Sequence, residues 1–229
     1  MPPDAGAADI TGLRVLLVAD LLTRIAELRN LQVFTVLAYD GQPGGQLAAL
    51  ERAVDTLGMH PPAARASSGE ASTSLGGPVD VHLVSEGARA DDRLSGLVTP
   101  VGAARIHGAG QGLLAGHEPA AVRLALLSFP YHRPADLTES VLADANATVG
   151  RWRLWVAEWA ESPSRPIPKP IAERARETFD DLDTVSALAL LADLASDAAL
   201  PTGAKFETFV YADRILGLDL PRDIGRAAR

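Results

Sequence analysis

The hydrophobic pattern of this chain changes character near its midpoint. Up to Val101, short runs rich in β-branched and aromatic residues alternate with segments whose apolar residues recur at helical spacing. After Val101 the pattern is helical, and no strand signal follows. Alternating strands and helices predict a small α/β layer, whereas successive helices with short connections predict an antiparallel helical bundle. We therefore expect two domains, residues 1–116 and 117–229.

The first half is expected to contain three strands, over residues 31–39, 79–85 and 96–101. A helix is expected over 46–59, where Pro61 and Pro62 follow it. Two segments have the small, polar and glycine-rich composition of loops, namely 63–78 and 102–116. Residues 11–30 allow either one long helix or a strand followed by a helix, because spacing alone does not separate the two.

The second half reads as a succession of helices. The first begins at Pro119, and the others are expected over 136–162, 168–180, 183–198 and 203–217. A proline-rich linker, residues 162–170, separates two of them. The acidic stretch 180–184 could hold a divalent cation, but the favoured interpretation is that Asp183 or Thr184 caps a helix N-terminus.

Composition excludes several classes of function. Twenty-nine acidic residues outnumber 21 basic ones, so the formal charge is −8 and nucleic acid is an unlikely partner. The absence of cysteine excludes disulfides, thiolate metal sites and cysteine nucleophiles, and the five histidines are dispersed, so no zinc or other metal is expected. The N-terminus has no signal-peptide pattern and no apolar run could span a bilayer, so we expect a cytoplasmic protein with no membrane partner.

Two short patterns could contribute to a ligand site. Gly108, Gly110 and Gly112 could let a phosphate approach the backbone, although no lysine follows and a plain glycine loop is the favoured interpretation. Asp80 and His82 alternate on an expected strand, so they would share a face and could form an acid–base pair.

Three tryptophans lie at helical spacing, at positions 152, 155 and 159. Trp152, Trp155 and Trp159 could form a stacking platform for a nucleobase. The favoured interpretation is a bundle core or a stripe that faces a protein partner, because large aromatic side chains usually serve burial.

Several segments of the second half resemble a known family. They are AAVRLALLSFPYHRP (120–134), SVLADANATVGRWR (140–153), FDDLDTVSALALL (179–191) and RILGLDL (214–220). These segments resemble cysteinyl-tRNA synthetases and their relative, the mycothiol-pathway ligase that joins cysteine to glucosaminyl-inositol. The resemblance implies a class I arrangement, in which a Rossmann-like parallel sheet, here small and degraded, is followed by a helical bundle.

The resemblance extends into the first half with marked departures. Residues 19–36 look like the helix and strand after the family's HIGH motif, which favours one long first helix. The HIGH position itself reads Asp9-Ile10-Thr11-Gly12, without histidine, and the KMSKS position reads Ala104-Arg105-Ile106-His107-Gly108, without lysine. The family's zinc ligands are missing, and we expect the first strand of the nucleotide fold to be missing as well.

The departures favour a non-catalytic pseudo-synthetase that acts as a binding module. An alternative is a small-molecule ligase or transferase that still binds ATP or an adenylate, and a second alternative is a tRNA-binding remnant. Any surviving nucleotide site is expected to use Asp9, Thr11, Gly12, Asp80, His82, Arg105, His107, Gly108 and Gly110. The open edge of a reduced sheet leads us to expect a homodimer or another protein partner.

Overall fold

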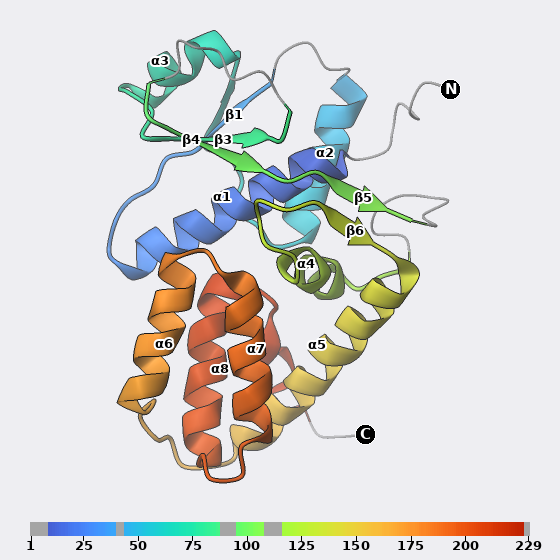
Figure 1. Ribbon diagram of the computed structural model, residues 1–229, viewed down its shortest axis with the longest axis vertical. Coiled ribbons are helices and arrows are strands. Elements are labelled where there is room, and N and C mark those ends of the chain that lie inside the picture. The colour runs from blue at the N-terminus through green and yellow to red at the C-terminus, as the bar shows by residue number, and fades with distance from the viewer. Residues whose placement is uncertain (1–8, 40–43, 88–94, 108–115, 227–229) are drawn as a thin grey trace. The chain divides into compact units, whose positions relative to one another are not determined.

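The computed structural model describes residues 9–39, 44–87, 95–107 and 116–226 (Figure 1). Within these ranges the chain forms eight α-helices and six short strands, and every strand pair is parallel. The protein is therefore a mixed α/β protein with a large helical content, which confirms the predicted class at that level.

The chain divides into two compact units. Unit 1 consists of Met1–Ala115 together with Tyr131–Leu137, and unit 2 consists of Gly116–Pro130 together with Thr138–Arg229. The short segment Tyr131–Leu137 thus joins a unit whose other residues all come from the first half of the chain.

Unit 1 begins with a single unbroken helix, α1 (Ile10–Leu28). The side chain of Asp9 caps it by accepting a hydrogen bond from the backbone N–H of Thr11, at 3.0 Å. Its apolar residues Leu13, Leu17 and Leu21 are buried, as the helical spacing requires. The structure thus selects one long helix over a strand followed by a helix.

The described residues of unit 1 contain six strands, which form three separate parallel pairs. They are β1 (Val36–Ala38) with β2 (Ala64–Ala66), β3 (Val81–Ser85) with β4 (Leu97–Val101), and β5 (Ala104–Ile106) with β6 (Ala135–Leu137). The remaining elements are α2 (Gly44–Thr56), the 3₁₀ helix η1 (Ser68–Glu70) and α3 (Ala71–Leu75).

Two sequence-based expectations for this unit are wrong. The expected loop 63–78 contains β2, η1 and α3, and the expectation of no strand after Val101 misses both β5 and β6. Strands of three residues show too little alternation to be recognised from sequence, and a partner distant in the chain decides their pairing.

A buried arginine connects the distant parts of unit 1. Arg14 on α1 is only 1% exposed, and its Nη1 donates to the carbonyls of Gly102 and Arg133, at 3.0 and 2.5 Å, and to that of Ala103 at 3.3 Å. An added Cβ at Gly102 would lie only 2.3 Å from the carbonyl oxygen of Arg133, so glycine permits this close approach. The arginine therefore holds the β4–β5 junction and the start of β6 against α1.

Unit 2 consists of five α-helices and a final 3₁₀ turn, namely α4 (Pro119–Leu127), α5 (Glu139–Trp159), α6 (Lys169–Asp180), α7 (Thr184–Ser196), α8 (Thr202–Leu216) and η2 (Leu220–Asp223). Helix α7 packs against α6 and α8, and α5 packs against α4 and α8. The predicted helices are confirmed to within a few residues. Asp183 is the N-cap of α7 and accepts from the N–H of Ser186 at 3.0 Å, which confirms the predicted cap.

The end of unit 2 is held by buried charged side chains. Arg123 and Arg153 donate to the carbonyls of Leu216, Leu218 and Asp219 at 2.5 to 3.0 Å. The carboxylate of Asp213 accepts from the N–H groups of Leu218 and Leu220, at 2.8 and 3.0 Å. Burial nevertheless raises the pKa of Asp213 above its ordinary value, since desolvation outweighs these two bonds.

We expect Arg14→Met to destabilise the protein strongly. The methionine fills the space but leaves the carbonyls of Gly102 and Arg133 without their charged donor, a loss of about 2–4 kcal/mol in the free energy of unfolding. Urea unfolding measures this change. The control is Arg52→Met on the exposed side of α2, which should stay within about 0.5 kcal/mol. Equal effects of the two variants would contradict the role given to Arg14.

Asp213 should make stability fall as the pH rises. With its pKa raised in the native state, Asp213 binds more protons there than in the unfolded chain between its ordinary pKa of 3.8 and the raised native value. Its contribution is therefore present below the ordinary pKa and is lost as the pH rises through the native one. The stability advantage of wild type over Asp213→Asn should shrink with rising pH in urea unfolding. An advantage that grows with pH would show that the two N–H bonds outweigh burial.

Candidate functional site

The first turn of α1 is joined directly to the start of β5. The N–H of Ala104 donates to Oγ1 of Thr11 at 3.1 Å, and the Thr11 hydroxyl lies 3.2 Å from the carbonyl of Ala104. These contacts bring together the two segments that the sequence places at the HIGH position (9–12) and the KMSKS position (104–108). The structure describes the second segment as far as His107. Thr11 is therefore engaged with backbone rather than directed at a ligand.

A carboxylate lies over the N-terminus of α1. Asp9 accepts from the N–H of Thr11, and an added Cβ at Gly12 would lie 2.7 Å from its Oδ2, so glycine leaves room for this carboxylate. Free N–H groups at a helix N-terminus would attract a phosphate. Here the side chain of Asp9 supplies the negative charge instead, and a phosphate arriving at this turn would meet it.

The exposed side of the β5–β6 pair carries both positive and negative charge. Arg105 is the register partner of Asp136, and Nε2 of His107 lies 3.5 Å from Oδ1 of Asp136. The side chains of His107 and Asp136 are 59% and 54% exposed, so water screens this pair. Asp136 was not a sequence-based candidate, and it offsets positive charge that Arg105 and His107 would offer an anion.

The pKa of Tyr39 indicates further negative charge near the first turn of α1. Partial burial raises the pKa of the Tyr39 phenol above its ordinary value, and the carboxylates of Asp9 and Glu51 raise it further. Tyr39 follows β1 directly, and Glu51 belongs to α2. The residues around the first turn of α1 thus create an environment that disfavours an added anion.

Two predicted candidates lie at a different place in unit 1. Asp80 precedes β3, and its backbone carbonyl accepts from the N–H of Leu97 at 2.8 Å. Nε2 of His82 lies 2.9 Å from the carbonyl of Ser95. Both residues stand at the amino ends of the β3–β4 pair, whereas ligands of open parallel sheets bind at the carboxyl ends. The candidates Gly108 and Gly110 lie outside the described residues.

The tryptophans of α5 lie mainly in the core of unit 2. Trp152 and Trp159 are 3% and 6% exposed, and each ring meets Phe209 of α8 edge-on, with centroids 5.4 and 5.1 Å apart. This corrects the partner-facing interpretation for these two residues, because their surface is already buried within the chain. Trp155 is half-buried, stacks on Trp159 and carries Arg151 over its ring at 5.8 Å.

A second polar cluster in unit 1 was missed by the sequence reasoning. Asp20 of α1 is 2% exposed. Its Oδ1 accepts from the backbone N–H of His60 at 2.9 Å and lies 2.6 Å from Nδ1 of the same residue. Arg24 donates to Asp20 at 2.9 Å and to the carbonyl of Gly58 at 2.7 Å. The cluster fixes the chain after α2 against α1. A charged residue within the apolar pattern of α1 was the available signal for both Asp20 and Arg14.

The described residues hold neither a metal-site candidate nor a membrane-span candidate. Among them, no three or more histidine, aspartate or glutamate side chains are grouped so as to hold a metal ion. None of the described helices has both the length and the apolar character needed to cross a membrane.

Comparison with known proteins gives partial homologues of two kinds. A cysteine–tRNA ligase of Xylella fastidiosa is 39% identical over 89 residues, which is 39% of this chain and 19% of the relative. The L-cysteine:1D-myo-inositol 2-amino-2-deoxy-alpha-D-glucopyranoside ligase of Streptomyces griseus is 43% identical over 75 residues, 32% of this chain and 17% of the relative. The enzyme of that name from Mycolicibacterium smegmatis is 36% identical over 110 residues, 46% of this chain and 26% of the relative. No protein-family model matches the chain.

The chain is therefore related to the cysteine–tRNA ligases and to the ligases that join cysteine to an aminoglucosyl-inositol, as its sequence segments predicted. It matches only about a fifth to a quarter of the length of these relatives, between 17% and 26%.

Proposed function

We propose that this protein is a non-catalytic relative of the cysteine ligases, a pseudo-synthetase that serves as a binding or interaction module. The observation that carries the proposal is the carboxylate of Asp9 over the first turn of α1. The relatives' names describe ligases of cysteine, and adenylation of an amino acid requires positive donors aimed at a phosphate. In this protein a negative group lies where such donors would be needed.

The expected energetic consequence is large. Removal of a single preorganised donor to a transition state costs about 10²–10³ in rate. The HIGH and KMSKS positions contain neither the histidines nor the lysines of the family, and Asp136 beside His107 offsets part of the remaining positive charge. These losses act at one site, so their effects compound without being strictly additive.

The finer architecture belongs to the same proposal. We infer that unit 1 is a reduced Rossmann-like layer, and that unit 2 is an antiparallel helical bundle. The exclusively parallel pairing of the described strands supports the first inference, because parallel pairs require crossover connections. The packing of α7 against both α6 and α8 supports the second.

One observation favours an alternative, a ligase or transferase that still binds ATP or an adenylate. Arg105 lies on β5 and His107 directly follows that strand, two residues further along the chain, and both are exposed to solvent. They could contact an anionic ligand from the same face. This alternative requires both nucleotide binding and cysteine-dependent chemistry by the wild-type protein, whereas the non-catalytic proposal excludes the chemistry.

The Asp9→Asn variant tests the proposal. Asparagine caps a helix as well as aspartate does, so the helix is retained while the charge is removed. We expect the unfolding midpoint of the wild type to be unchanged by millimolar ATP·Mg²⁺ or by a non-hydrolysable cysteinyl-adenylate mimic. Asp9→Asn should gain a shift, because a ligand at 100 times its dissociation constant adds about 2.7 kcal/mol, or several degrees.

The matched control is Asp183→Asn, the same replacement at the N-cap of α7, which should gain no shift. A clear shift in the wild type, together with cysteine-dependent ATP–pyrophosphate exchange, would reject the non-catalytic proposal in favour of the ligase. If the unfolding midpoint shifts in neither the wild type nor Asp9→Asn, the charge of Asp9 is not what prevents nucleotide binding.

We further propose that unit 1 associates with a second copy of the chain. Val81 and Leu97 are register partners at the amino ends of β3 and β4, and they are 42% and 63% exposed. Paired residues on neighbouring strands lie about 5 Å apart on the same face, so these two side chains form one exposed apolar patch. Such a patch at the end of a short sheet favours burial against another chain.

Leu97→Lys should weaken this association. We expect light scattering to show wild-type dimers at high concentration and monomers for Leu97→Lys, because a lysine at the patch would be buried without a partner. Leu154→Lys is the control, since Leu154 is 69% exposed on α5 and lies in unit 2. A wild type that remains monomeric, or a Leu154→Lys variant that dissociates equally, would contradict the proposed patch.

A further inference from the structure

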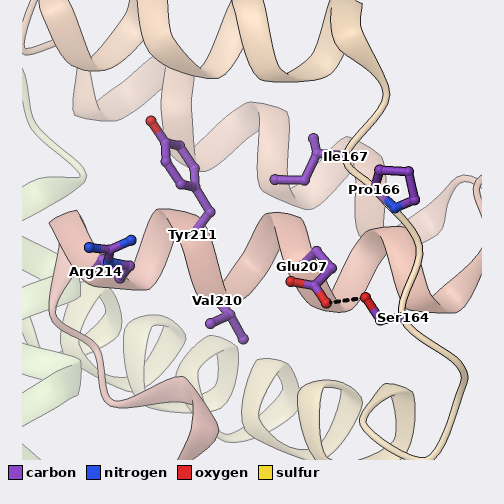
Figure 2. A pocket seen from close by; sticks show the side chains of 7 residues that line it. All are labelled: Ser164, Pro166, Ile167, Glu207, Val210, Tyr211 and Arg214. Atoms are coloured by element: carbon purple, nitrogen blue, oxygen red, sulfur yellow. Dashed lines mark hydrogen bonds between the residues drawn. The ribbon is translucent and has the colours of Figure 1, made fainter. Parts of the chain in front are cut away.

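An open groove lies in unit 2 between α8 and the proline-rich segment that precedes α6. It encloses about 510 Å³ and is lined by Ser164, Pro166, Ile167, Glu207, Val210, Tyr211 and Arg214. Figure 2 shows Glu207 and Arg214 at the two ends of the α8 wall, with Val210 and Tyr211 between them. All the residues that line the groove belong to unit 2, and none of them was discussed at the first turn of α1.

The α8 wall is one continuous stripe of the helix. Residues 207, 210, 211 and 214 follow the i, i+3, i+4, i+7 spacing that places side chains along one face. Tyr211 also packs against the buried cluster that contains Leu190 and Leu194, so its ring is held from behind. The Tyr211 ring therefore presents a fixed apolar surface within this wall.

The opposite wall is held to α8 at its beginning. Oγ of Ser164 donates to Oε1 of Glu207 at 2.6 Å, and the Thr202 hydroxyl lies 2.8 Å from that of Ser162. At Gly203 an added Cβ would lie 2.1 Å from the carbonyl of Pro163, so glycine permits the close approach of the two backbones. The prolines of this wall restrict its backbone further. The groove is thus preformed on both sides.

The charges at the two ends of the groove set the length of a matching ligand. Glu207 and Arg214 are seven residues apart on α8, and at 1.5 Å per residue this separates them by roughly 10 Å. An extended peptide rises about 3.3 Å per residue, so three residues span the same distance. The apolar side chains of Ile167 and Val210, with the Tyr211 ring, line the stretch between.

We propose that this groove binds a short extended peptide of about three residues, with its amino group at Glu207 and its carboxylate at Arg214. The carboxylate of Glu207 would pair with the ammonium group, and the guanidinium of Arg214 would pair with the terminal carboxylate. The apolar lining favours aliphatic side chains. A nucleotide with its phosphates at Arg214 would leave Glu207 without a cationic partner, whereas a free peptide pairs with both end charges. This inference goes beyond the proposed pseudo-synthetase role and does not depend on it.

The test uses the full chain and the free tripeptide Val-Val-Val as the probe. Titration calorimetry measures affinity, and amide chemical shifts locate the site. We expect saturable binding with shifts centred on Glu207, Val210 and Tyr211. Acetylating the amino group or amidating the carboxylate should each weaken binding about fivefold, the factor expected for the loss of one solvent-exposed charge pair.

The Glu207→Gln variant makes the test specific. Glutamine keeps an oxygen that can accept from Ser164 but removes the charge, so acetylating the peptide should have no further effect on binding to this variant. Arg214→Gln should likewise abolish the effect of amidation. Glu173→Gln is the matched control, since Glu173 is an exposed acid on α6 that pairs with Lys169 at 3.7 Å, outside the groove. It should leave the affinity unchanged.

The proposal is overturned if the peptide does not bind at millimolar concentration. It is also overturned if both blocked peptides bind as tightly as the free one, because the apolar lining alone would then account for binding. Equal loss of affinity in Glu207→Gln and Glu173→Gln would mean that Glu207 does not bind the amino group of the peptide, which also overturns the proposal. Because these readouts depend on unit 2 alone, their failure leaves the nucleotide experiments unaffected.

Discussion

The organisation of unit 1 depends on the guanidinium of Arg14. A buried cation is costly unless hydrogen bonds replace its water, and Arg14 finds its partners in the carbonyls of Gly102, Ala103 and Arg133. These carbonyls belong to segments 88 to 119 residues away along the chain. Satisfying one side chain therefore fixes where the β4–β5 junction and the start of β6 lie on α1. Burial lowers the pKa of Arg14, although Glu86 opposes this change and the arginine stays charged.

In unit 2, buried charged side chains likewise bind backbone groups, here at its C-terminal end. Arg123 and Arg153 donate to carbonyls of the turn after α8, while Asp213 accepts from two N–H groups of that turn. A turn that follows a helix exposes several unpaired backbone groups, and these side chains satisfy them inside the protein. The segment RILGLDL, which the sequence singled out for its resemblance to the mycothiol-pathway ligase, thus has a structural role in this chain.

The relationship to cysteine ligases and the proposed loss of their chemistry are compatible. Packing residues and buried hydrogen bonds can preserve a fold while the charges at a reaction centre change, because the two depend on different side chains. At the first turn of α1 it is the sign of the local charge that changes. A helix N-terminus that would attract phosphate is capped by Asp9, and Glu51 and Asp136 add further negative charge in the same unit.

The sequence by itself determined the elements whose signals are local. The helices of unit 2, the N-cap at Asp183, the start of α4 at Pro119 and the relationship to cysteine ligases all follow from spacing, capping residues and segment similarity. Only the tertiary structure decided the strands β2, β5 and β6, the burial of Trp152 and Trp159, and the partners of Arg14 and Asp136. In each of these cases the deciding contact joins residues far apart in the chain. Sequence patterns register local periodicity, and a contact between residues tens of positions apart or more leaves no such signal.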